Sequence, residues 1–122
     1  MAFDWKEFLT LAEYLMEERD SRVSRECLQR AAVSRAYYAV FCTIRDRLAR
    51  GADFTRTGTA SDHAAVVEYL RQHGHSTAAI WLSRLRQWRN QCDYDNDVTN
   101  LPVLANDALG YARSLVEASV QW

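Results

Sequence analysis

The scarcity of helix-breaking residues is the feature that most constrains the fold of this chain. Only one proline and four glycines occur in 122 residues, so few positions offer a break inside a secondary-structure element. Such a sequence favours long helices over a sheet protein with many turns. The length suits one domain with its own core. We therefore expect a single domain over residues 1–122, folded as an all-α bundle of about five helices.

Local start and stop signals divide the chain into the expected helices. Their ranges are, in order, residues 4–18, 22–50, 61–73, 76–89 with fraying around 93–97, and 100–122. The start signals are an Asp4–Glu7 capping box, Ser61 or Asp62, Ser76, and Asn100 followed by Pro102. Gly51 ends the long second helix, and residues 51–61 are rich in Gly, Thr and Ser, which predicts a flexible loop.

Charge and cysteine usage narrow the class of protein. The net charge is -1, which argues against sequence-independent coating of DNA. Fifteen basic side chains could still gather into a local site. Cys27, Cys42 and Cys92 show no CxxC spacing, so we interpret them as buried apolar side chains in a reducing compartment.

The chain gives no sign of a membrane segment or a metal site. Its first residues lack the apolar run of a signal peptide, and no stretch approaches the roughly 20 apolar residues that cross a bilayer. We expect a cytoplasmic protein. His73 and His75 flank Gly74, but no third metal ligand stands at a recognisable spacing. We therefore expect neither a metal nor another cofactor.

Arg35 lies within a broad and mostly apolar arc of the second expected helix. Ala31, Leu28, Cys42 and Ala39 surround it on the helical wheel. A buried guanidinium needs an anionic or hydrogen-bonding partner, because an unpaired buried charge is costly. One interpretation is a structural ion pair with a carboxylate such as Asp93. The other is a site that receives an anionic ligand.

Polar residues crowd one side of the fourth expected helix. They share an arc of about 140°, beside an apolar face that carries Trp81 and Trp88. The set is Arg86, Arg89, Asn90, Asp93 and Tyr94. Two arginines, an amide, a carboxylate and a phenol could face a phosphate or a nucleotide. The alternative is a polar seam that sets the packing register or a dimer contact.

Two sequence blocks together resemble a known family. They are SRAYYAVF, from Ser34 to Phe41, and RNQCDY, from Arg89 to Tyr94, with His63 between them. The combination resembles a HEPN domain, most closely the small stand-alone UPF0332 group. The resemblance implies an antiparallel four- to five-helix bundle that dimerises. It also implies a metal-independent ribonuclease of the toxin or defence type, paired with a nucleotidyltransferase antitoxin.

The resemblance assigns roles to individual residues. Arg89 matches the catalytic arginine and Asn90 the polar position after it, while Tyr94 stands where the family has a catalytic histidine. A phenol has an ordinary pKa near 10, far above that of imidazole. The residues expected to bind substrate are Arg35, Tyr38, Arg86 and Asp93. Two functions stay open: an RNA- or nucleotide-binding component that cleaves RNA, and a catalytically silent module that dimerises and docks a nucleotidyltransferase.

Other candidates carry simpler interpretations. Arg56 and His63 also satisfy the family's arginine-to-histidine spacing, but they span an expected loop, and we treat the match as accidental. His63 is more simply a packed, hydrogen-bonded side chain. The basic residues in 19–30 and 45–50 are most simply solvated helix faces. A basic groove for RNA would require them to converge with Arg86 and Arg89.

Overall fold

The residues that the structure describes fold into five packed helices, as the sequence predicts. The computed structural model describes residues 2–51 and 54–122, so residues 52–53 of the expected loop lie outside the described residues. The helices are α1 (Glu7–Glu17), α2 (Arg25–Arg50), α3 (Ser61–Gln72), α4 (Ser76–Tyr94) and α5 (Leu101–Ser119). Within the described ranges there is no β-strand. None of the helices described is long and apolar enough to cross a membrane.

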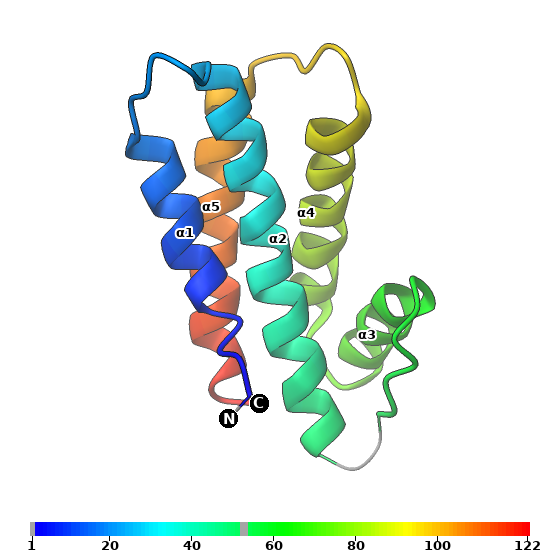
Figure 1. Cartoon of the computed structure of the whole chain (residues 1–122). Coiled ribbons are helices and arrows are strands. Elements are labelled where there is room, and N and C mark those ends of the chain that lie inside the picture. Colours follow the sequence, from blue (N-terminus) through cyan, green and yellow to red (C-terminus); the bar gives the residue numbers. More distant parts are fainter. Residues whose placement is uncertain (1, 52–53) are drawn as a thin grey trace.

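Four of the helices form an antiparallel bundle, and the fifth lies beside it. In Figure 1, α1, α2, α4 and α5 run alternately up and down, whereas the short α3 packs next to the start of α4. The helix α2 lies between α1 and α4, with α5 behind it. Residues from α1, α2 and α4 therefore share one face of the molecule.

The core is centred on α2. This helix buries side chains around most of its circumference, and it packs against all four other helices. Several fully buried positions on α2 and α5 are alanines: Ala32, Ala36, Ala39, Ala105, Ala108 and Ala112. Small side chains allow two helices to approach closely, as ridges pack into grooves. The broad apolar arc predicted for this segment is thus explained by its central place.

Three arginines of α2 bind the carboxyl ends of the other long helices. Their guanidinium groups donate to main-chain carbonyl oxygens that have no partner within their own helix. Arg25 donates to Met16 in the last turn of α1 and to Glu18 after it. Arg30 donates to Cys92 in the last turn of α4 and to Asp95 and Asn96 after it, and Arg47 donates to Val120 and Trp122 after α5. Much of the basic character of α2 therefore stabilises helix ends.

Several helix starts differ from the sequence prediction. Ser24 caps α2 by accepting from the Cys27 amide, so α2 starts later than the expected Arg22. Ser61 and Ser76 are first helical residues, preceded by Ala60 and His75. Asn100 does precede α5, in a left-handed conformation with φ 54°. Ser61 and Ser76 therefore predict the starts of α3 and α4 to within one residue.

Two expected carboxylate caps have different partners. Asp4 accepts from the Lys6 amide, so the predicted capping box with Glu7 is not formed as expected. Asp62 accepts from the Thr57 hydroxyl and from the amides of Thr57 and Gly58, and these hydrogen bonds lower the pKa of its carboxyl group. The later part of the expected flexible loop is therefore tied to the start of α3.

The end of α4 falls within the range expected from the sequence, and one further prediction is corrected by the structure. The helix ends at Tyr94, inside residues 93–97, and Arg30 binds the carbonyls that follow. Cys42 and Cys92 are buried, as predicted, but Cys27 is exposed near the start of α2. All three cysteines are unpaired thiols.

Candidate functional site

Arg35 is stacked between aromatic rings, and this corrects the expected ion pair with Asp93. Its Cζ atom lies 4.9 Å from the ring centroid of Phe8 on α1 and 5.2 Å from that of Tyr38 on α2. The side chain is half-buried, and it forms no ion pair with any described residue. Cation–π contacts thus hold the guanidinium and leave its positive charge without a carboxylate.

Arg89 shares the Tyr38 ring with Arg35. Its Cζ atom lies 5.2 Å from the Tyr38 centroid and 5.6 Å from the centroid of Tyr94. The contacting side chains alternate between rings and guanidinium groups. They come from α1, α2 and α4, which lie next to one another in Figure 1. We call this set, Phe8–Arg35–Tyr38–Arg89–Tyr94, the arginine–aromatic row.

Neighbours on α4 hold Arg89 in place. Its Nη1 donates to Asn90 Oδ1 at 2.8 Å, and its Nε lies 2.9 Å from Asp93 Oδ2. The Nε–H is not directed at that oxygen and makes no hydrogen bond, so the contact with Asp93 is an ion pair. Ser34 Oγ donates to the same carboxylate oxygen at 3.3 Å, which connects α2 to α4.

The expected site carries more positive than negative charge. Arg35 and Arg89 belong to the row, Arg86 lies outside the row on α4, and Asp93 is the carboxylate of the expected site. The larger basic groove considered from the sequence is not formed in full, because Arg25, Arg30 and Arg47 are bound to helix-end carbonyls. An anionic ligand at this face would therefore contact Arg35 and Arg89 of the row, and not an extended basic helix face.

A buried tyrosine–histidine pair lies close to Arg86. Tyr37 Oη and His63 Nδ1 are 2.8 Å apart, and both side chains are buried. Burial, together with the positive charge of Arg86, lowers the pKa of His63 to about 4, so the imidazole is neutral at pH 7. Burial raises the pKa of Tyr37. The prediction of a packed, hydrogen-bonded His63 is confirmed.

The second arginine-to-histidine match brings no catalytic pair together. Arg56 Nη1 lies 3.5 Å from Asp46 Oδ1, whereas His63 bonds to Tyr37. The two side chains have separate partners on α2. The interpretation of this match as accidental agrees with those contacts.

The row offers groups for binding more than groups for proton transfer. The row consists of guanidinium, phenol and phenyl groups, and Asn90 and Asp93 beside Arg89 add an amide and a carboxylate. None of these groups has an ordinary pKa near neutrality. Tyr94 is 73% exposed at the end of α4, where it can contact a ligand. The arrangement can pair with anions through Arg35 and Arg89 and stack flat rings on the exposed Tyr94.

The remaining aromatic and histidine candidates lie elsewhere. Trp81 and Trp88 are half-buried and stack on Tyr111 of α5, with centroid distances of 4.6 and 5.4 Å. His73 stacks on Tyr69, and His75 on Trp122. Over residues 2–51 and 54–122, no three His, Cys, Asp or Glu side chains gather as metal ligands would.

Sequence reasoning missed Phe8 and the role of Ser34. Phe8 reaches Arg35 from another helix, and no pattern within α1 signals a contact across that distance in the chain. Ser34 is part of the SRAYYAVF block and lies near Tyr38 on the helical wheel of α2. This position was the sequence signal that could have pointed to its contact with Asp93.

Comparison with known proteins found no matching family model and no significant match to a curated protein or a solved structure. The assignment to the HEPN superfamily therefore stays a prediction from the two sequence blocks.

Proposed function

We propose that this protein binds single-stranded RNA at the arginine–aromatic row. The observation that carries the proposal is the alternation itself, in which Arg35 and Arg89 both contact the Tyr38 ring and each also contacts a second ring. The Cζ atoms of both guanidinium groups lie 5.2 Å from the Tyr38 centroid, so the two groups can bind neighbouring phosphates of one strand. Single-stranded nucleic acids are bound by this combination of basic and aromatic side chains.

The chemistry of the row favours single strands. An unstacked base can lie on an exposed ring such as Tyr94, and this stacking tolerates any base because each one presents a π-face. In a duplex the base faces are covered by their neighbours, so only the phosphates would remain for Arg35 and Arg89. We therefore expect the same RNA to bind more tightly as a single strand than as a duplex.

RNA binding, and not cleavage, is the core of the proposal. In the HEPN-like mechanism Arg89 would stabilise charge on the scissile phosphate, with Asn90 beside it. Tyr94 would replace the histidine that moves the proton, and a phenol is poorly suited to that task at neutral pH. A toxin-like ribonuclease remains compatible with Arg89, but the absence of an imidazole among the row residues favours slow cleavage or none.

A second candidate is the assembly module suggested by the same resemblance. The observation that favours it is the stack of Trp81, Tyr111 and Trp88, which is only half-buried on α4 and α5. Aromatic side chains of this kind are enriched at protein interfaces. A homodimer, or a complex with a nucleotidyltransferase, would cover them. Sedimentation of the purified chain over a range of concentrations tests for the homodimer.

The test of the proposal compares binding and cleavage in one set of reactions. Labelled single-stranded RNA, and the duplex of the same sequence, are titrated with wild type and with Arg89→Ala in EDTA. We expect binding of the single strand, weakened by Arg89→Ala, with little cleavage. Metal-independent cleavage that Arg89→Ala abolishes would establish a nuclease. Equal affinity of both proteins for both RNAs would contradict a site on the row.

A further inference from the structure

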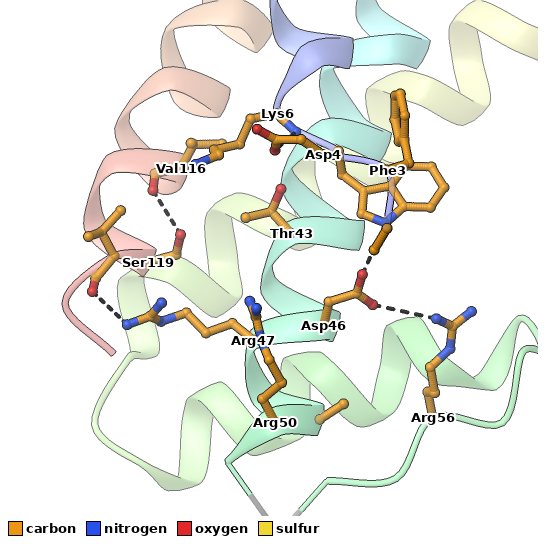
Figure 2. Close-up of a pocket in the computed structure, with 14 residues that line it drawn as sticks. Phe3, Asp4, Lys6, Thr43, Asp46, Arg47, Arg50, Arg56, Val116 and Ser119 are labelled. Carbon is orange, nitrogen blue, oxygen red and sulfur yellow. Dashed lines mark hydrogen bonds and ion pairs between the residues drawn. The ribbon is translucent and has the colours of Figure 1, made fainter.

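A separate cavity lies at the end of the bundle where the two chain ends meet. It has a volume of about 570 Å³ and lies between residues 2–6, the second half of α2 and the end of α5. Figure 2 shows its lining side chains. We call it the basal cavity. Its cations are Lys6, Arg47, Arg50 and Arg56, against the two carboxylates of Asp4 and Asp46, so the lining has two surplus positive charges.

The carboxylates of the basal cavity are already engaged. Asp46 Oδ2 accepts from Trp5 Nε1 at 3.0 Å, and Asp46 Oδ1 accepts from Arg45 Nε at 2.9 Å. Asp4 Oδ1 accepts from the main-chain amide of Lys6. Neither the Lys6 ammonium nor the Arg50 guanidinium forms an ion pair in the part of the chain that the structure describes. Figure 2 shows the Arg50 guanidinium rising between Arg47 and Asp46 toward Thr43.

An orphaned hydroxyl lines the same cavity. Thr43 Oγ1 is buried and has no hydrogen-bond partner among the described residues. Buried polar atoms in native proteins are nearly always hydrogen-bonded, so this hydroxyl is available to a partner bound in the cavity. Because Lys6 and Arg50 line the same cavity without an ion pair to a described residue, an oxygen acceptor with negative charge would suit the hydroxyl and the cations together.

We propose that the basal cavity binds a phosphate monoester. Lys6 and Arg50 would pair with the phosphate oxygens, and Thr43 would donate its hydroxyl hydrogen to one of them. A monoester carries about -1.5 to -2 at pH 7, which matches the surplus of the lining better than the single charge of a phosphodiester. Phe3 and Trp5 line the same wall and can contact a flat ring. The chemistry fits a free mononucleotide or the phosphorylated end of a nucleic-acid strand.

The size of the basal cavity agrees with such a ligand. Small-molecule sites in proteins commonly enclose about 300–1,000 Å³, with a few polar groups on a partly apolar wall. The proposal is independent of RNA binding at the arginine–aromatic row, because the two sites share no residue.

The first experiment identifies the recognised group. Calorimetric titrations use AMP, adenosine, inorganic phosphate, and an oligonucleotide with a 5′-phosphate or a 5′-hydroxyl. We expect AMP to bind at least about tenfold more tightly than adenosine, the loss expected when charge-assisted hydrogen bonds are removed. Tighter binding of the 5′-phosphorylated oligonucleotide would identify a strand end as the source, and binding of AMP alone would identify a free nucleotide. Equal binding of AMP and adenosine would overturn the proposal.

The second experiment places the ligand. Arg50→Gln and Thr43→Val remove one proposed contact each, while Arg71→Gln removes one exposed charge on α3 as a matched control. We expect AMP affinity to fall about tenfold in Arg50→Gln and several-fold in Thr43→Val, and to stay unchanged in Arg71→Gln. Circular dichroism checks that each variant is folded. Folded Arg50→Gln and Thr43→Val proteins that bind AMP as wild type does would overturn the proposal.

Discussion

His63 is hydrogen-bonded to Tyr37. Its burial and the positive charge of Arg86 disfavour the protonated form of the imidazole. The pKa of His63 is about 4 in the folded chain, against about 6.5 in an unfolded one. Below pH 6.5 the unfolded chain gains a proton at this residue that the folded chain does not. The contribution of His63 to stability is therefore complete above pH 6.5 and is lost as the pH falls toward 4.

The depressed pKa of His63 predicts how stability changes with pH. Between pH 7 and pH 5 the free energy of unfolding should fall by about 2 kcal/mol on account of this residue. His63→Gln has no imidazole, so its loss over the same interval should be smaller by that amount. Urea denaturation of both proteins at the two pH values measures the difference. Identical pH dependence would show that His63 is not held neutral.

Arg30 provides a second prediction at this scale. Its guanidinium donates to three carbonyls at the carboxyl end of α4 and its side chain is 18% exposed, so Arg30→Met leaves those acceptors without the donor. We expect a loss of about 2 kcal/mol in the free energy of unfolding. Arg30→Lys should recover only part of it, because one ammonium lacks the guanidinium fork. Arg71→Met, at an exposed pair on α3, should cost less than about 0.5 kcal/mol.

At the scale of the elements, α2 determines how closely the other helices approach. Ala36 is completely buried in α2, so a larger side chain there must displace its neighbours. We expect Ala36→Leu to destabilise the fold by about 1–3 kcal/mol. Ala65→Leu, at an exposed position of α3, is the matched control and should change stability by less than about 0.5 kcal/mol. Thermal unfolding of the two variants side by side measures this, and equal stabilities would contradict the packing described.

The sequence predicts elements better than it predicts contacts between them. The apolar arc around Arg35 correctly indicated a central helix, because helical periodicity depends on neighbours in the sequence. The partner of Arg35 was predicted wrongly, since Asp93 is one turn from Arg89 and the ring of Phe8 comes from another helix. Local pairs follow from spacing, whereas contacts between helices depend on how those helices pack.

At the scale of the whole molecule, the arginine–aromatic row and the basal cavity adjoin. Phe3, Trp5 and Phe8 form an aromatic cluster with centroid distances of 5.0, 5.2 and 5.6 Å. Phe8 is one end of the row, and Phe3 and Trp5 line the cavity. The two blocks of sequence that suggested the family supply most of the row. Nothing in the sequence pattern marked the cavity, because its lining comes from segments far apart in the chain.

We propose that Arg35 and Arg89 act together on the phosphates of single-stranded RNA. The most direct measurement is the dependence of RNA affinity on salt concentration, because each phosphate contact adds about -0.7 to the slope of log affinity against log salt for a single strand. The proteins are wild type, Arg35→Gln, Arg89→Gln, the double variant, and Arg71→Gln as the control.

We expect a slope about 0.7 shallower in each single variant of the row, about 1.4 shallower in the double variant, and unchanged in Arg71→Gln. Affinity at low salt should fall in the same order. A folded double variant with the wild-type slope and affinity would contradict RNA binding at the row, because RNA would then bind to another surface of the molecule.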